Sequence, residues 1–325
     1  MTDENKEKIT EDQHYVPQFY LKQWLDPTGG FYPVKIEEKI PPKLKIFDKK
    51  SDQSRFCYEN FFYAQHTGVA DEVSQVIEKK FAEIEAIFSN ELPILEKKIV
   101  NCEQISESEK FHLAECMIFL HFRGKKYLDQ SKKMTDEVTK QMMKHWVQYI
   151  DKSPKSKARM EESGLTKEQM VDYVHKGEFT VDYGNMHHLQ IMKDMGGFCN
   201  ILSAKFWRVY ISHEGHFITT DAPYLDMPVT NTFFGNDFLS REQSFILSPR
   251  VMIVALYPNN NNGKKFVRKD ITNNRAFIQQ LNLHNLMNAI RFGFHKDRDL
   301  LVELEKLIQF VHQMKIREKD QRSIK

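Results

Sequence analysis

Residues 14–21, which read HYVPQFYL, bring several chemically active side chains together in one short stretch. His14 carries an imidazole that titrates near neutral pH, while Gln18 and Tyr20 can hydrogen-bond a ligand. Pro17 restricts the backbone between them, which favours a fixed arrangement of these groups. We therefore expect His14 to act as a general acid or base and Gln18 and Tyr20 to contact a substrate.

A second candidate lies in residues 217–223, FITTDAP, where an apolar run is followed by two hydroxyls and a carboxylate. Pro223 restricts the loop that presents Asp221. Carboxylates that follow a strand are common catalytic or metal-binding groups, because loops at strand ends carry function. A structural role for Asp221 is equally open, because aspartate often accepts backbone hydrogen bonds in turns.

Arg123 lies deep in an otherwise apolar helical stretch and needs a partner if it is buried, since an unpaired buried charge is costly. The carboxylates of Glu78, Glu85 and Asp221 are candidate partners. A phosphate group of a substrate is another, because a guanidinium binds phosphate through two parallel hydrogen bonds.

Three asparagines, Asn282, Asn285 and Asn288, recur at every third position between apolar neighbours, and Arg291 follows at the same spacing. Asparagine is a poor helix former, so such a stripe indicates specific hydrogen bonding along one helical face. Its partner is either a ligand, which would make these four residues substrate contacts, or the loops that carry His14 and Asp221.

Together these residues suggest a hydrolase that acts on a phosphodiester or a nucleotide, in the manner of a nuclease, as a toxin or an antiphage defence effector. His14 would be the acid or base, Arg123 would hold an anionic group, and Asp221 would orient His14 or bind a divalent metal ion. Glu85 and Asp221 are the candidate metal ligands. Nucleic acid or a nucleotide is the expected partner.

The alternative is a module without catalytic activity, in which the same polar side chains join the N-terminal block to the C-terminal helix. Its function would then be to bind nucleic acid or a protein, or to sense a nucleotide. Exposed basic pairs such as Lys125-Lys126 and Lys132-Lys133 would contribute to nucleic-acid binding, although such pairs are by default ordinary surface residues.

Other patterns argue against a structural metal site or disulfides. His213-Glu214-Gly215-His216 resembles an HExxH motif but has the wrong spacing and falls between two strand-like runs, so we interpret it as a turn. The four cysteines are far apart and form no CxxC pair.

Composition indicates a globular chain. Its 325 residues are 41% hydrophobic, which is enough for a substantial core, and a net charge of +2 implies no extended basic surface. Neither the polar start of the chain nor any later segment contains the roughly 18 consecutive apolar residues of a membrane span. We expect a cytoplasmic protein that does not contact a membrane.

Hydrophobic periodicity predicts an α+β fold that is mostly helical, with a long helical hairpin, a small mostly antiparallel sheet and closing C-terminal helices. The predicted helices are residues 71–100, 106–150, 166–177, 185–205 with an interruption at Gly196-Gly197, 274–294 and 298–314. The predicted strands are residues 31–36, 44–47, 206–211, 217–220, 245–247 and 251–257. We expect a flexible leader at 1–13, one domain at 14–314 with an exposed insertion near 151–165, and a basic tail at 315–325.

Successive landmarks along the chain resemble the uncharacterised bacterial domain-of-unknown-function family 4238. These are the HYVPQFYL block, CYENFFY at 57–63, Glu78, Glu85, Arg123, Phe206-Trp207, FITTDAP at 217–223 and the asparagine-rich helix through Arg291. Relatives carry TSDNP around the aspartate where this chain has Thr220 and Ala222, which counts against a direct role for those two residues. The resemblance implies a single-unit domain in a prokaryotic or phage-related intracellular setting, and it implies no reaction.

Overall fold

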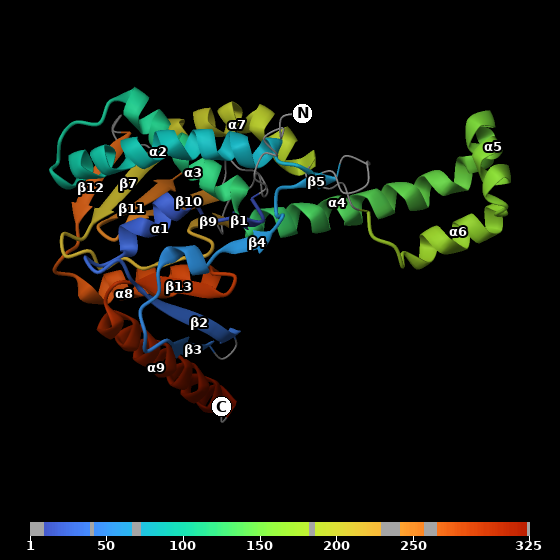
Figure 1. The fold of residues 1–325 in the computed structure, drawn as a ribbon. Helices are drawn as coiled ribbons and strands as arrows, with labels where there is room; N and C mark the ends of the chain where they lie inside the picture. Colours follow the sequence, from blue (N-terminus) through green and yellow to red (C-terminus); the bar gives the residue numbers. More distant parts are fainter. Residues whose placement is uncertain are drawn as a thin grey trace, which may run out of the picture.

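The computed structural model describes residues 10–39, 42–66, 73–181, 186–228, 241–256 and 265–323, and it has an α+β fold. Figure 1 shows a body in which two larger sheets lie between helices, and a helical arm that projects from this body. Some predicted positions lie outside the described residues. They are residues 1–9 of the predicted leader, residues 324–325 of the basic tail, and residues 71–72, 185 and 257 of predicted helices and strands.

The larger sheet has five strands in the order β12-β7-β11-β10-β9. Its strands are β12 (Phe266–Asp270), β7 (Phe206–Ile211), β11 (Val251–Leu256), β10 (Arg241–Ser248) and β9 (Tyr224–Pro228). All neighbours are antiparallel except β12 and β7. The centre of the sheet is almost continuously apolar in sequence because helices and the second sheet cover its two faces.

The second sheet has four antiparallel strands in the order β3-β2-β13-β8. These are β3 (Pro42–Ile46), β2 (Tyr32–Lys39), β13 (Phe292–His295) and β8 (Thr219–Thr220). The strands predicted at residues 31–36 and 44–47 are therefore confirmed as β2 and β3, and the two strands pair with each other. Since β8 and β9 follow each other in the chain but belong to different sheets, the residues between them carry the chain from one sheet to the other.

Short elements complete the N-terminal part. β1 (Asp12–His14) pairs with β4 (Tyr58–Asn60), β5 (Gln65–His66) pairs with β6 (Val73–Ser74), and the HYVPQFYL block continues into the single-turn helix α1 (Gln18–Leu21). The last two residues of the predicted leader thus lie in a paired strand. Pro17 is the N-cap of α1, and the φ angle that its ring fixes suits this position at the start of a helix.

The predicted helical hairpin consists of α2 (Val76–Val100) and α3 (Glu107–Arg123). A capping box between Ser106 and Glu109 begins α3, as the sequence predicts. The prediction that this helix continues to residue 150 is wrong. Gly124 adopts an extended backbone with ψ 140°, so α4 (Lys125–Trp146) starts a new helix in a new direction. A Cβ at Gly124 would lie 3.2 Å from two carbonyl oxygens of α3, which explains why glycine suits this break.

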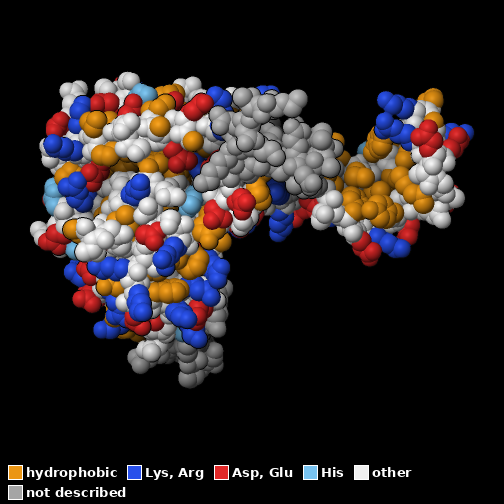
Figure 2. All heavy atoms as spheres, in the orientation of Figure 1, with side chains coloured by type: hydrophobic (Ala, Val, Ile, Leu, Met, Phe, Trp, Pro, Cys, Tyr) orange, Lys and Arg blue, Asp and Glu red, His pale blue; other side chains and the backbone are white. Residues whose placement is uncertain are grey.

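The arm consists of α4, a 3₁₀ segment (Val147–Lys152), α5 (Pro154–Ser163) and α6 (Lys167–Lys176). The predicted insertion near 151–165 lies at its tip. Met134, Val138 and Met142 form a stripe along α4 and are 63%, 51% and 67% exposed. Figure 2 shows hydrophobic side chains gathered near the tip of the arm.

Three further helices complete the fold: α7 (Met186–Ala204), α8 (Arg275–Asn288) and α9 (Arg298–Ser323). Two predictions need correction. The helix expected at 274–294 ends at Asn288, because Phe292 to Phe294 pair as strand β13, and α7 continues without a break through Gly196-Gly197. Residues 315–323 of the predicted basic tail belong to α9. Among the described residues, we find no helix that is both long and apolar enough to span a membrane.

We expect Gly293→Ala to lower the free energy of unfolding by about 1–3 kcal/mol. Gly293 lies in β13, and a Cβ there would stand 2.7 Å from Leu286 Cδ1 and 3.1 Å from Val34 Cγ1. The matched control is Gly196→Ala in α7, where a Cβ would meet no atom within 4 Å and where alanine should stabilise the helix by roughly 0.5–1 kcal/mol. Urea denaturation measures both, and equal effects at the two sites would contradict this packing.

Candidate functional site

Arg123 is 2% exposed and is held entirely by internal partners. Its Nε and Nη2 donate to the backbone oxygen of His14 at 2.9 and 2.5 Å, and its Nη1 pairs with Glu85. The predicted pairing of Arg123 with a carboxylate is therefore confirmed for Glu85. The rings of Tyr63, Phe81 and Phe119 lie 5.1–5.6 Å from the guanidinium. Arg123 thus joins the N-terminal block to α2 and α3.

The imidazole of His14 faces a different set of atoms. Its Nε2 lies 3.2 Å from the backbone oxygen of Ser54 and 3.4 Å from Nε2 of Gln18. Partial burial lowers the pKa of His14, and the hydrogen bond to Ser54 opposes that shift. Arg123 therefore meets the backbone of His14 and not the ring that sequence analysis placed in the chemistry.

Asp221 is fully buried, and its carboxylate accepts three backbone hydrogen bonds. Oδ1 accepts from the N–H of Ile290 at 2.8 Å, and Oδ2 accepts from Arg291 and Phe292 at 2.8 and 2.9 Å. Burial raises the pKa of Asp221 to about 6, although the three amides favour the ionised form. This pattern matches the structural alternative for Asp221, since the carboxylate closes the turn between α8 and β13.

Two of the predicted substrate contacts are deeply buried. Tyr20 donates its hydroxyl hydrogen to the oxygen of Ile246 at 2.6 Å and lies 2.8 Å from Oγ1 of Thr219. Asn282 accepts from the N–H of Ile218 at 3.1 Å and donates to the oxygen of His216 at 2.8 Å. Both residues therefore connect segments of the body, and neither lines the pocket described below.

The remaining predicted contacts differ in their surroundings. Gln18 hydrogen-bonds His14 and Gln53, and Arg291 is exposed, with its guanidinium 5.0 Å from the ring of Phe292. The buried amide nitrogen of Asn285 has no hydrogen-bond partner among the described residues. Asn288, at the end of α8, lines the pocket described below.

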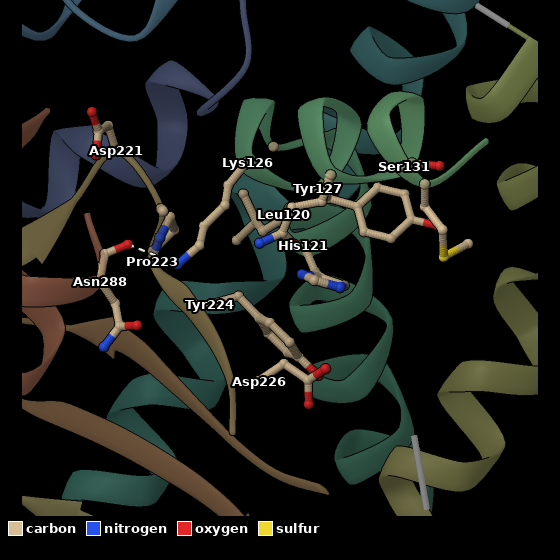
Figure 3. A pocket seen from close by; sticks show the side chains of 14 residues that line it. Leu120, His121, Lys126, Tyr127, Ser131, Asp221, Pro223, Tyr224, Asp226 and Asn288 are labelled. Atoms are coloured by element: carbon tan, nitrogen blue, oxygen red, sulfur yellow. Dashed lines mark hydrogen bonds between the residues drawn. The ribbon is translucent and has the colours of Figure 1, made fainter. Parts of the chain in front are cut away.

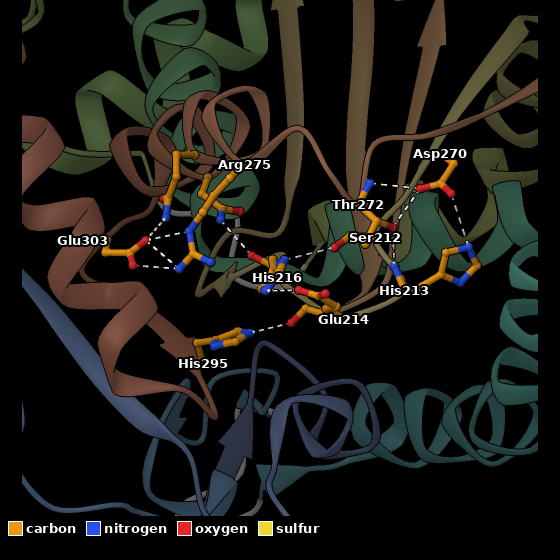
Figure 4. A network of polar contacts seen from close by, with 12 residues as sticks. Ser212, His213, Glu214, His216, Asp270, Thr272, Arg275, His295 and Glu303 are labelled. Carbon is orange, nitrogen blue, oxygen red and sulfur yellow. Dashed lines mark hydrogen bonds and ion pairs between the residues drawn. The ribbon is translucent and has the colours of Figure 1, made fainter.

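The candidate metal ligands lie with different partners, Glu85 with Arg123 and Asp221 with backbone amides. In the part of the chain that the structure describes, no group of three or more His, Cys, Asp or Glu side chains could hold a metal ion. The HEGH motif forms a turn, as the sequence predicts, with Gly215 at φ +74°. Figure 4 shows its two histidines beside different carboxylates: His213 is 3.6 Å from Asp270, and His216 is 3.1 Å from Glu214.

A pocket of about 450 Å³ lies where α3 ends and α4 begins (Figure 3). Its other walls are the 221–224 loop, β9 and the end of α8. Its polar lining includes His121, Lys126, Tyr127, Gln130, Ser131, Asp226 and Asn288. The volume falls within the range of sites that take a small organic ligand.

The wall formed by α4 carries positive charge. Gly124 precedes the first residue of α4 and offers no side-chain cap, and the first turn contains no acidic residue. Of its two lysines, Lys126 lines the pocket, whereas Lys125 pairs with Glu59 and Asp129. The ammonium group of Lys126 donates to the backbone oxygen of Asn288 at 2.9 Å. This hydrogen bond fixes the ammonium group against the end of α8. The positive end of the helix dipole and this ammonium group both favour an anionic ligand.

Sequence reasoning missed the pocket residues His121 and Asp226, and it named Lys126 only as half of an exposed basic pair that would contribute to nucleic-acid binding. The signal for Lys126 was Gly124, because a glycine inside a long predicted helix followed by two lysines can mark the start of a second helix. No comparable pattern marks His121 or Asp226, since their proximity depends on the packing of α3 against β9.

One family model, described as protein of unknown function DUF4238, matches residues 12–299. The chain belongs to this family. The matched range contains both larger sheets, the arm and the whole pocket. No curated protein and no solved structure matches the chain. The DUF4238 description names no reaction, so the function has to be argued from the pocket.

We expect Arg123→Met to lower the free energy of unfolding by roughly 3–5 kcal/mol, because it leaves Glu85 and the oxygen of His14 without their buried partner. The matched control is Arg291→Met, which removes an exposed arginine and should change stability by less than about 0.5 kcal/mol. Chemical denaturation measures both variants. If Arg123→Met were as stable as the control, the guanidinium would be a ligand contact and not an internal connection.

Asp221 should make stability depend on pH in a defined direction. Because its folded-state pKa is raised, the folded protein holds this proton more tightly, and the stabilisation is fully present at acidic pH and is lost as pH rises toward about 6. The difference in unfolding free energy between wild type and Asp221→Asn should therefore be larger at pH 4.5 than at pH 7.5. Other titrating groups cancel in this difference. A difference that grows toward neutral pH would show that the amides control the pKa of Asp221.

Proposed function

We propose that this protein binds a phosphorylated ligand of nucleotide size in the pocket at the start of α4. The observation that carries the proposal is the combination of Lys126 with the uncapped N-terminus of a 22-residue helix in one wall of a 450 Å³ pocket. Backbone N–H groups at a helix start and a nearby ammonium group are a common phosphate-binding arrangement.

Aromatic side chains in the same pocket support a nucleotide as the ligand. The ring centroid of His121 lies 4.3 Å from that of Tyr224 and 5.0 Å from that of Tyr127, and all three residues line the pocket. Aromatic faces stack with nucleobases irrespective of the base. A ligand with an anionic end and a flat aromatic end would therefore fit both parts of the lining.

A free nucleotide suits the pocket better than a nucleic-acid strand. Lys126 lies in a concave site, and the chain has a net charge of only +2, whereas a nucleic-acid surface requires basic residues spread along the phosphate backbone. A nucleotide-sensing module in the cytoplasm is thus the function we favour.

Hydrolysis of the bound nucleotide is a second candidate, because His121 and Asp226 place an imidazole and a carboxylate in the same pocket. One of them would take a proton from water as the water oxygen attacks phosphorus, and the bond from phosphorus to the leaving phosphate oxygen would break. This candidate keeps the hypothesis of a nucleotide hydrolase that serves as a toxin or an antiphage effector, but moves its chemistry to residues other than His14 and Asp221.

We expect isothermal titration calorimetry with ATP, GTP, CTP and UTP to detect binding of at least one of them, and Lys126→Ala to weaken that binding about tenfold or more, since the variant removes a charge-assisted contact. Lys132→Ala is the control, because Lys132 is exposed on the same helix and does not line the pocket. Equal affinities in the two variants, or no binding to wild type, would contradict the proposal.

The same samples separate binding from hydrolysis. Release of phosphate that is lost in His121→Gln, while nucleotide affinity remains, would support the hydrolase. Binding without turnover would support the sensing module.

A further inference from the structure

The tip of the arm carries a row of exposed side chains. In a 3₁₀ helix, side chains three residues apart lie above one another, so they form rows along the 3₁₀ segment that follows α4. Val147 and Ile150 form a buried row. Trp146, Tyr149 and Lys152 form another, which starts at the last residue of α4, and all three are exposed. This row therefore faces away from the interior of the arm.

Two aromatic rings of this row are open to a partner. Trp146 is 59% exposed and Tyr149 is 43% exposed, whereas Trp24 and Trp207, the other tryptophans of the chain, are fully buried. The ammonium nitrogen of Lys152 lies 4.6 Å from the ring centroid of Tyr149. Large apolar side chains that lie together in water are unfavourable, so such a patch indicates an interaction surface.

The arm also concentrates positive charge. Residues 125–176 contain twelve lysines and arginines and eight acidic residues, which gives the arm a net charge of +4 with histidine neutral. The whole chain has a net charge of +2, so the rest of the chain is net negative. An anionic partner is therefore attracted to the arm in preference to the body.

Four exposed cations at the tip have no acidic partner among the described residues. They are Lys152 and, on α5, Lys155, Lys157 and Arg159. Asp151 pairs instead with Lys167 at 2.8 Å, and Glu161 and Glu162 lie at the opposite end of α5 from Lys155. The tip therefore presents uncompensated positive charge beside the aromatic row.

A single-stranded nucleic acid is the partner that matches both features. Its phosphates bind cations, and its unpaired bases stack on aromatic faces whatever their identity. A duplex fits less well, because its bases already stack on one another. A membrane surface also fits less well, since an interfacial helix needs a continuous apolar face, and α5 offers only Ala158 and Met160 beyond Pro154.

We propose that the tip of the arm binds single-stranded nucleic acid, with bases stacked on Trp146 and Tyr149 and phosphates on the four unpaired cations. Figure 2 shows the hydrophobic side chains of the arm tip with Lys and Arg side chains beside them. None of these residues lines the nucleotide pocket, so this is a second site that does not depend on the proposed function.

Fluorescence anisotropy with a labelled oligothymidylate of about 20 nucleotides, without a terminal phosphate, tests the role of charge. Wild type should bind it, and the logarithm of the association constant should fall against the logarithm of salt concentration with a slope of about −3, as expected for about four phosphates. The triple variant Lys155→Gln/Lys157→Gln/Arg159→Gln should make this slope shallower by about two, because each cation contributes about 0.7.

The matched control changes three exposed lysines of the body that form no ion pair with a described residue: Lys49→Gln/Lys97→Gln/Lys306→Gln. It removes the same charge as the tip variant at positions away from the arm. Its slope should therefore differ from that of wild type by less than about 0.5.

Trp146 reports stacking directly. The oligonucleotide should quench the fluorescence of this exposed tryptophan, while the buried Trp24 and Trp207 continue to emit. Trp146→Ala should weaken binding about fivefold or more, whereas Trp146→Phe keeps an aromatic face and should stay within about threefold of wild type. Circular dichroism checks that both variants keep their helical content.

Four results would each overturn the inference: no binding of wild type to the oligonucleotide, equal or tighter binding of the corresponding duplex, equal slopes in the tip and body variants, or unchanged affinity in Trp146→Ala. If the oligonucleotide does not bind but vesicles of phosphatidylserine and phosphatidylcholine do, the tip is a membrane surface instead. Because the pocket is a separate site, none of these results bears on the proposed function.

Discussion

The passage of the chain from one sheet to the other depends on the buried carboxylate of Asp221. β8 belongs to the four-stranded sheet and β9 to the five-stranded sheet, and Asp221 lies directly between them. Its side chain binds the three N–H groups that precede and begin β13, and its own N–H donates to the oxygen of Phe292 at 3.0 Å. The loop is thus fixed to the neighbouring turn, and the start of β9, with its pocket residues, is fixed with it.

The N-terminal block reinforces the same junction. Tyr20 contacts Thr219 of one sheet and Ile246 of the other through a single hydroxyl, and Trp24 donates to the oxygen of Phe217 at 2.8 Å. Arg123 then attaches this block to the α2–α3 hairpin. Buried polar groups must be hydrogen-bonded, and here each of them joins segments that are far apart in the sequence. Structural polar residues of this kind therefore cannot be distinguished from catalytic ones in a sequence, because both are polar residues set among apolar neighbours.

Local patterns made much of the fold predictable. The capping boxes at Ser106 and Thr166 begin helices where expected, and the apolar runs of β7 and β11 are strands. Patterns failed where tertiary contacts override local preference. Phe292 to Phe294 continue a helical spacing but pair with β2, and the backbone of Gly124 redirects a helix that its neighbours would extend. The pocket could not be predicted, because its lining comes from segments whose proximity is set by the Asp221 junction.

The helix α4 has a mechanical consequence for the arm. Its 22 residues span about 33 Å at a rise of 1.5 Å per residue, and its first turn forms a wall of the pocket. Because α5 and α6 lie at the far end of this helix, a small tilt of α4 about Gly124 would translate them much further than it moves the first turn. The distal end of the molecule is therefore geometrically sensitive to whatever fills the space beside the first turn of α4.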